Sequence, residues 1–263
     1  MMHDLSEKSV FLTGAGGVLG TSHIANLLAR SATVVASELP GARYDALQDK
    51  FGDEKSFHLY PLNVTDEAQV ARCFSDIAND GLTPNVFINN AAVTGELLMR
   101  DGKDFPDLSQ TPLDAWQAAL DVNLTGAFLI AREIDRQVVS KRPFQLINVA
   151  SMYALNAPHH NIYEGMPFKN FSAYSATKAG IHGLTLWLAS YWADENATVN
   201  TLAPGAVFNG HSQTFQDRVS NLIMMGRMAQ PEEISDALAF LCSDNARYMT
   251  GQVLNIDGGF SSW

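Results

Sequence analysis

The fold is decided near the start of the chain, by Ser9-Val10-Phe11-Leu12-Thr13-Gly14-Ala15-Gly16-Gly17-Val18-Leu19-Gly20. The apolar run Ser9–Leu12 has the length of a buried strand, and a helical pattern follows the glycines through about Arg30. Glycines between a strand and a helix let the backbone approach a phosphate group, whose charge the helix N-terminus favours. The stretch therefore predicts a strand–turn–helix unit that contacts a pyrophosphate through Gly14, Gly16, Gly17, Val18, Leu19 and Gly20.

Short apolar runs alternate with helical patterns along the rest of the chain. Further strands are predicted at Thr33–Ala36, Phe57–Pro61, Asn85–Asn89, Gln145–Val149, Thr198–Leu202 and Gln252–Ile256. Helices are predicted at Asp66–Asn79, Pro112–Val139, Ser172–Trp192 and Glu232–Leu241. Strands that are apolar on both faces and alternate with helices indicate a parallel sheet covered on both sides. We therefore expect the α/β class, with a doubly wound, Rossmann-like parallel sheet in a single domain over residues 1–263.

Three segments interrupt this alternation, at residues 92–110, 153–171 and 207–227. Each follows the carboxyl end of a predicted strand, which is where ligands bind in open α/β sheets. The third segment shows few apolar residues at core spacing. We expect the three segments to wall one pocket.

Composition excludes several classes of function. The chain has 263 residues and a formal net charge of -11, which makes it a poor candidate for a nucleic-acid or anionic-membrane binder. Cys73 and Cys242 show no spacing typical of a metal site, so we expect free thiols in a reducing compartment and no metal. The N-terminus lacks a signal-peptide pattern, and no apolar run is long enough to cross a bilayer. These observations predict a cytoplasmic protein.

Glu38 follows the second predicted strand, about twenty residues beyond the glycines. A carboxylate at this spacing can accept hydrogen bonds from both hydroxyls of an adenosine ribose, and it would repel the 2′-phosphate of NADP. No arginine flanks Glu38 in the sequence, and Arg43 is the nearest basic residue. The pattern predicts NAD as the cofactor; the plainer interpretation is a surface carboxylate after a strand.

Tyr174 and Lys178 lie four residues apart at the start of a strongly helical segment, so both side chains can reach one site. A free tyrosine has a pKa near 10, which is too high for a base at neutral pH. A nearby ammonium group favours phenolate and lowers that pKa, so the pair predicts proton exchange with a substrate oxygen. Most pairs at this spacing are nevertheless chance neighbours on a helix surface.

Two further polar residues are candidates for the same site. Ser151 ends the fifth strand, and its hydroxyl could hold a reacting oxygen for the tyrosine. Asn123 interrupts an otherwise apolar helix, and a buried amide needs hydrogen-bond partners. It either caps a local irregularity of the backbone or orders water beside Lys178.

In this order the residues resemble the short-chain dehydrogenase/reductase family over nearly the whole chain. The matching positions are Thr13-Gly14…Gly20, Asn89-Asn90-Ala91-Ala92, Asn123, Ser151, Tyr174…Lys178, Pro204-Gly205 and Asp257-Gly258-Gly259. The resemblance implies an NAD-dependent oxidoreductase that moves a hydride between nicotinamide and a secondary alcohol or ketone. Its implied catalytic roles are general acid/base for Tyr174, pKa-lowering partner and ribose ligand for Lys178, oxygen donor for Ser151 and relay support for Asn123.

The resemblance also implies the remaining cofactor contacts. Asn90, Ala91 and Ala92 would lie on the adenosine side, Asn63 and Val64 beside the adenine, and Pro204, Gly205 and Val207 beside the nicotinamide. Val18 stands where the family motif has a glycine, which alters the expected pyrophosphate contacts. Because family members commonly form tetramers through two long helices and the C-terminal region, a homo-oligomer is expected.

A narrower resemblance points to bacterial oxidoreductases of surface-sugar biosynthesis, of the flagellin glycan and legionaminic acid type. It rests mainly on Ile162-Tyr163-Glu164-Gly165, on Pro204 to Asn209 and on the ending Asp257 to Trp263. It implies a sugar derivative as substrate, and polar residues of the interrupting segments agree: His159, His160, Tyr163, Glu164, Asn209 and His211. Arg100 and Lys103 could face a phosphate. Phe168, Phe171 and Phe208 leave an apolar ketone or acyl substrate open.

Two other functions are compatible with this fold. A non-catalytic NAD-binding regulator is disfavoured by the complete set of Ser151, Tyr174 and Lys178. A lyase or epimerase that uses bound NAD without net turnover stays open.

Overall fold

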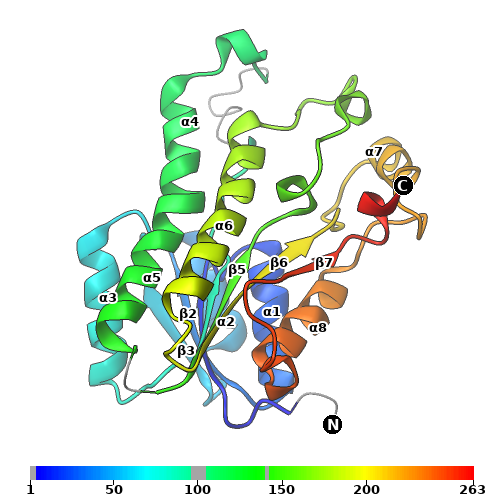
Figure 1. The fold of residues 1–263 in the computed structure, drawn as a ribbon. Coiled ribbons are helices and arrows are strands. Elements are labelled where there is room, and N and C mark those ends of the chain that lie inside the picture. The colour runs from blue at the N-terminus through cyan, green and yellow to red at the C-terminus, as the bar shows by residue number, and fades with distance from the viewer. Residues whose placement is uncertain (1–3, 96–104, 140–141) are drawn as a thin grey trace.

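The computed structural model describes residues 4–95, 105–139 and 142–263 and contains one parallel sheet of seven strands (Figure 1). The strand order is β3-β2-β1-β4-β5-β6-β7, and every adjacent pair is parallel. The strands are β1 (Ser9–Thr13), β2 (Thr33–Glu38), β3 (Phe57–Pro61), β4 (Val86–Asn89), β5 (Phe144–Val149), β6 (Ala197–Pro204) and β7 (Val253–Ile256). The prediction of a doubly wound α/β sheet is confirmed.

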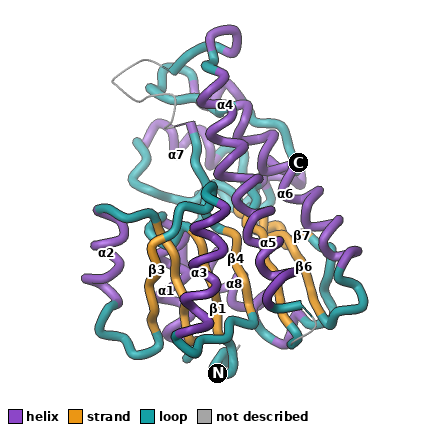
Figure 2. The backbone as a smooth tube through the Cα atoms, turned by 90° about the vertical axis from the view of Figure 1, so that its left-hand side faces the viewer, coloured by secondary structure: helices purple, strands orange, loops and turns teal. Residues whose placement is uncertain are grey.

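Helices cover both faces of the sheet (Figure 2). One face carries α1 (Val18–Ala29), α2 (Ala42–Phe51) and α8 (Pro231–Cys242). The other carries α3 (Glu67–Asn79), α5 (Gly126–Gln137) and α6 (Ser172–Tyr191). Alternate side chains of each strand enter opposite cores: Val10 and Leu12 pack toward α1, whereas Phe11 packs toward α3. This two-sided burial explains why the strands are apolar throughout.

The long helix predicted between the fourth and fifth strands is interrupted. It consists of α4 (Leu113–Leu120), a π-helical segment at Asp121–Thr125, and α5. Asn123 lies inside the π segment and is buried. A π segment widens the helix by one residue, and such bulges commonly occur at functional sites. Asn123 therefore lies within a local irregularity of the backbone, although no side chain caps the π segment.

The sequence analysis missed two helices. The first is α2, between the second and third strands, and the second is α7 (Gln213–Ser220), inside the segment 207–227. The prediction that this segment has few core residues is wrong, because Phe215, Val219 and Ile223 are buried there. They pack with residues of the segment 153–171 into a separate apolar cluster beyond the carboxyl ends of the strands. Their spacing escaped detection because α7 is only eight residues long.

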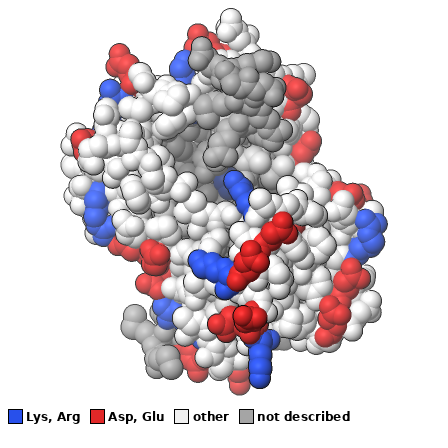
Figure 3. Space-filling model, turned by 180° about the vertical axis from the view of Figure 1, so that it is seen from behind, with Lys and Arg blue, Asp and Glu red and all other residues white. Residues whose placement is uncertain are grey.

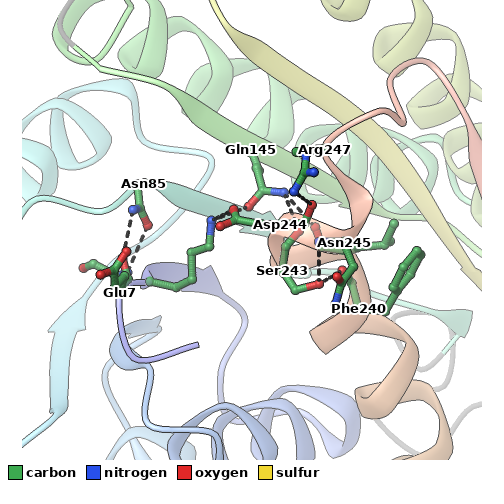
Figure 4. A network of polar contacts seen from close by, with 11 residues as sticks. Glu7, Asn85, Gln145, Phe240, Ser243, Asp244, Asn245 and Arg247 are labelled. Atoms are coloured by element: carbon green, nitrogen blue, oxygen red, sulfur yellow. Dashed lines mark hydrogen bonds and ion pairs between the residues drawn. The ribbon is translucent and has the colours of Figure 1, made fainter. Parts of the chain in front are cut away.

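Polar contacts join the chain at the amino ends of the strands, opposite to that cluster (Figure 4). Lys8 Nζ lies 2.7 Å from Asp244 Oδ1 and 3.4 Å from Gln145 Oε1. Asn85 accepts a hydrogen bond from the backbone N–H of Ser9 at 3.0 Å. These contacts tie the start of β1 to β5 and to the turn after α8. None of the described helices is long and apolar enough to cross a membrane.

Candidate active site

A cavity of about 540 Å³ opens at the carboxyl ends of the strands. Its wall is built from the glycine turn after β1 and from the segments that follow β2, β3, β4, β5 and β6. Parallel strands bring these ends to one edge of the sheet, so residues far apart in sequence meet there. The segments 92–110 and 207–227 both supply residues of the wall, whereas no residue of 153–171 does, so the expectation that all three wall one pocket is wrong for that segment. Residues 96–104 of the first segment fall outside the described residues, and so do Arg100 and Lys103.

The glycine turn forms one end of the cavity. Gly14 has φ +65°, and a Cβ placed there would lie 2.5 Å from the Ala91 Cα, so only glycine fits this close approach. The N-terminus of α1 follows directly, and no side chain caps it. Uncapped backbone N–H groups at a helix start attract anions. Val18 is the first residue of α1, and its half-exposed side chain lines the cavity at this helix start.

Glu38 lies beside the same turn. Its carboxylate accepts hydrogen bonds from the backbone N–H groups of Gly16 at 2.8 Å and of Leu39 at 2.9 Å. Arg43, in the first turn of α2, lines the cavity as well, and a Cβ on Gly16 would lie 2.7 Å from its Cβ. Arg43 does not flank Glu38 in the sequence, but α2 places it against the glycine turn. This end of the cavity therefore presents one acidic and one basic side chain.

Tyr174 and Lys178 occupy the opposite part of the cavity. Both belong to the first two turns of α6, and both line the cavity. The Lys178 ammonium lies 5.7 Å from the centre of the Tyr174 ring and donates a hydrogen bond to the Val149 carbonyl at 2.8 Å. Val149 is the last residue of β5, so this hydrogen bond fixes Lys178 relative to the sheet and to Ser151, which follows β5. The two side chains lie together, as their four-residue spacing predicted.

Burial governs the pKa of both groups. It raises the pKa of Tyr174 above its ordinary value of 10.0, an effect that a hydrogen bond with Ser151 opposes and nearby Tyr163 reinforces. Burial also lowers the pKa of Lys178 from 10.5 to about 8. Burial thus acts against the predicted effect of the ammonium group, whose influence on the phenol stays a prediction. Loss of hydration disfavours the charged form of each group.

Ser151 follows Ala150, just after the end of β5. Its side chain is buried and lines the cavity near Tyr174. Its hydroxyl also accepts a hydrogen bond from the Tyr153 backbone N–H at 3.2 Å, which caps a short 3₁₀ turn at Met152–Ala154. Ser151 is therefore both the residue that caps this turn and the candidate catalytic residue. The turn uses one of the two lone pairs of the hydroxyl and leaves its proton available for donation on the cavity side.

Asn123 does not line this cavity. Its amide Oδ1 accepts from the Val93 backbone N–H at 2.7 Å, and its Nδ2 donates to the Val93 carbonyl at 3.0 Å and to Thr177 Oγ1 at 3.1 Å. The π segment thus joins the loop after β4 to the helix that carries Tyr174 and Lys178. The structure shows a positioning contact for Asn123, whereas its implied role in a proton relay stays a prediction.

All other predicted cofactor residues except Gly16 line the cavity: Gly14, Gly17, Val18, Leu19, Gly20, Glu38, Asn63, Val64, Asn90, Ala91, Ala92, Tyr174, Lys178, Pro204, Gly205 and Val207. Of the polar substrate candidates, Asn209 and His211 line it, whereas the others named from segment 153–171 do not. The sequence analysis also missed several apolar neighbours, of which Val93, Val122 and Val149 are examples. In the sequence, the only indication that these valines line the cavity is that each lies within two residues of a predicted site residue.

Surface charge agrees with a small-molecule site. On the face shown in Figure 3, Lys and Arg alternate with Asp and Glu instead of gathering into a basic patch. The expectation that the chain lacks a nucleic-acid partner stays a prediction.

Comparison with known proteins identifies the family. A family model described as "Enoyl-(Acyl carrier protein) reductase" matches residues 19–261. The 3-oxoacyl-[acyl-carrier-protein] reductase of Aquifex aeolicus is 28% identical over 97% of this chain and 98% of its own length. The acetoacetyl-CoA reductase of Allochromatium vinosum is 31% identical over 96% and 98%.

A solved short-chain dehydrogenase from Leptospira borgpetersenii with bound NAD+ superposes with a TM-score of 0.82 at 26% identity, covering 98% of this chain and 94% of that one. These relatives include reductases of acyl substrates and do not single out the surface-sugar branch. They agree with a cavity that joins a glycine turn to the Ser151, Tyr174 and Lys178 set. The chain belongs to the short-chain dehydrogenase/reductase family and is an oxidoreductase of CH–OH groups with a nicotinamide dinucleotide cofactor.

Proposed function

We propose that this protein transfers a hydride between NAD and a secondary alcohol or ketone of a sugar or sugar derivative. The observation that carries the proposal is the convergence of Ser151, Tyr174 and Lys178 with the glycine turn in one cavity. The uncapped start of α1 and the close approach at Gly14 fit a pyrophosphate. The nicotinamide, when bound, supplies or accepts the hydride.

The chain's own residues would handle the proton. Tyr174, held as a neutral phenol by burial, would donate its proton to a substrate oxygen during reduction and recover it during oxidation. The Ser151 hydroxyl would donate a hydrogen bond to the same oxygen and hold it within reach of the phenol. Lys178, anchored on the Val149 carbonyl, would direct its remaining N–H groups toward the cofactor ribose and the phenol.

Glu38 supports NAD as the cofactor. Its carboxylate lines the cavity beside the glycine turn, where the adenosine ribose would lie. Two backbone hydrogen bonds hold the carboxylate in place and leave further lone pairs free for ribose hydroxyls. Among the described residues at this end of the wall, Arg43 is the basic side chain that would favour a 2′-phosphate, so Glu38 and Arg43 form a testable pair.

Packing favours a hydroxylated substrate. The three phenylalanines that could have made an apolar pocket are directed into packed clusters: Phe168 and Phe208 join the cluster around Phe215, and Phe171 is buried beside Tyr174. No phenylalanine appears among the described residues of the cavity wall. The resemblance to surface-sugar oxidoreductases supports the same substrate class.

The test is turnover of a panel of sugars, sugar phosphates and nucleotide sugars, scored by NADH absorbance. Tyr174→Phe should bind NADH with unchanged affinity, measured by fluorescence, and should lose at least about a thousandfold in turnover. Tyr60→Phe is the matched control, because Tyr60 bonds to Asp80 outside the cavity. Near-normal turnover by Tyr174→Phe would remove the phenol from the mechanism.

A second candidate is reduction of an acyl thioester, since the relatives named above include an acyl-carrier-protein reductase and an acetoacetyl-CoA reductase. It uses the same proton chemistry and differs only in the substrate. Turnover of acetoacetyl-CoA in preference to every sugar tested would favour it.

We also propose a homo-oligomer. Trp187 and Tyr191 stack on the exposed side of α6 with ring centres 4.7 Å apart, and each is 58% exposed. Phe128 on α5 is also exposed. Large aromatic side chains on adjoining helices are typical of interfaces. Light scattering that reports a monomer at micromolar concentration would contradict the proposal.

A further inference from the structure

The segment after β6 builds the wall of the cavity next to the reacting groups. It contributes Val207, Asn209 and His211. Because β6 pairs with β5, whose end is followed by Ser151, this wall stands beside the candidate catalytic residues and not at the Glu38 end. The His211 ring packs against Phe215, and Phe215 belongs to the apolar cluster against which Tyr174 also packs.

The position of the His211 ring is held by several contacts. Its centre lies 5.1 Å from the Phe215 ring, with 31° between the ring planes. The Gln216 side chain donates to the His211 carbonyl at 2.7 Å, and Ser212 caps α7 by accepting from the Phe215 backbone N–H. The backbone of His211 is therefore held at the start of α7, and its ring contacts Phe215 and the Asn209 N–H.

One hydrogen bond determines which ring nitrogen carries the proton. The backbone N–H of Asn209 donates to His211 Nδ1 at 3.2 Å, so Nδ1 supplies a lone pair. A neutral imidazole has one donor and one acceptor nitrogen, which places the proton on Nε2. Partial burial lowers the pKa of His211, so the ring is neutral at physiological pH. No protein partner for this Nε2–H occurs among the described residues.

We propose that His211 determines substrate specificity by donating its Nε2–H to a hydroxyl oxygen of a polyol or sugar, beside the carbon that exchanges hydride. The inference rests on the proposed function and names the side chain that recognises its substrate. Asn209 on the same wall adds an amide that can both donate and accept, which suits a substrate whose hydroxyls do both.

Charge and chemistry favour a neutral hydroxyl over the other ligands. Among the described residues near the reacting end, Lys178 is the only Lys or Arg of the wall, and its ammonium is buried on the Val149 carbonyl. A carboxylate or phosphate would therefore meet a neutral donor there. An alkyl chain would cover the Nε2–H without replacing its hydrogen bond to water, and an unpaired polar group lowers affinity.

Two substitutions separate the donor from the structural role of the ring. His211→Asn places an amide oxygen near the position of Nδ1, keeping the bond from Asn209 but removing the donor to the cavity. His211→Gln places an amide N–H near the position of Nε2 and keeps that donor. The assay measures kcat and KM with NAD for sorbitol, mannitol, galactitol and glucose, with cyclohexanol and 3-hydroxybutyryl-CoA as substrates that lack a hydroxyl next to the reacting carbon.

We expect at least one polyol or sugar to be oxidised. His211→Asn should raise its KM about 3- to 10-fold, the effect of one neutral hydrogen bond, with little change in kcat. His211→Gln should stay within about twofold of the parent protein. The KM for cyclohexanol should be the same for all three proteins, and NADH fluorescence should report equal cofactor affinity.

The other outcomes overturn the proposal in distinguishable ways. Equal KM for His211→Asn and the parent protein, or equal loss in both variants, removes the donor role while hydride transfer stands. Turnover of 3-hydroxybutyryl-CoA with no polyol oxidised rejects the substrate class alone. No turnover of any alcohol, with Tyr174→Phe indistinguishable from the parent protein, rejects the proposed function itself.

Discussion

Replacement of Thr185 by valine tests how the catalytic helix is held on the sheet. Thr185 lies in α6 and is fully buried. Its hydroxyl accepts from Asn148 Nδ2 of β5 at 2.9 Å and from the Thr201 hydroxyl of β6 at 2.9 Å, and it donates to the Ile181 carbonyl at 3.0 Å. Asn148 in turn accepts from Asn89 Nδ2 of β4 at 2.8 Å. One hydroxyl thus links α6 to three neighbouring strands.

Valine preserves the shape of threonine and removes only this hydroxyl. The Asn148 amide and the Thr201 hydroxyl would then be donors without an acceptor, in a region with no access to water. A buried unpaired donor costs about 1–3 kcal/mol, so the two donors together should lower the free energy of unfolding by roughly 2–6 kcal/mol. For a domain of this size that corresponds to a fall in Tm of the order of 10 °C.

Urea unfolding followed by tryptophan fluorescence, at one fixed protein concentration, measures this loss. Thr185→Ser is the matched control, because it keeps the hydroxyl and loses a methyl group worth about 1 kcal/mol. The double variant Thr185→Val, Thr201→Val should lose less than the sum of the single changes, since one substitution removes the partner of the other. The reasoning is refuted if Thr185→Val proves no less stable than Thr185→Ser.

Two further predictions concern charge. Glu38→Ala should weaken NAD binding about 10- to 100-fold, which is the effect of losing a charge-assisted hydrogen bond. It should also strengthen NADP binding, unless Arg43 is replaced as well. An unchanged ratio of the Kd values for NAD and NADP would refute the assignment of Glu38 to the ribose. Because the pKa of Lys178 is lowered from 10.5 to about 8, the folded protein binds fewer protons than the unfolded chain between these values. The difference in free energy of unfolding between the parent protein and Lys178→Met should therefore rise by about 1.4 kcal/mol per pH unit from pH 8 to 10.5. Parallel stability–pH profiles of the two proteins would contradict the lowered pKa of Lys178.

The sheet could be predicted from sequence because each strand is apolar on both faces and lies between helical patterns. All seven predicted strands occur in the parallel sheet, with ends that differ by few residues. The cavity residues could be predicted for the same reason: Gly14, Ser151 and Pro204 each stand at the carboxyl end of a strand. Parallel pairing brings such ends together, whatever their separation in sequence.

Residues that reach the cavity from helices or loops could not be predicted in this way. Arg43 lines the wall only because α2, which has a weak apolar pattern, returns along the sheet and places it on Gly16. Phe215 and Val219 belong to a core because two interrupting segments pack on each other, a contact that no local period records. Sequence periodicity reports which side of an element is apolar, but not which distant segment covers it.

The pKa of Tyr174 is a further property that the sequence alone does not determine. From sequence, only the charge four residues away is visible, and an ammonium at that distance lowers a phenol's pKa. Burial acts in the opposite direction, and its size depends on how many atoms surround the phenol, which is a property of the folded cluster around Phe171 and Phe215. The same packing lowers the pKa of Lys178 to about 8. The polar groups of a bound substrate and cofactor would replace part of the water that these groups have lost, so the proton chemistry of this pair depends on what the cavity binds as well as on the four-residue spacing.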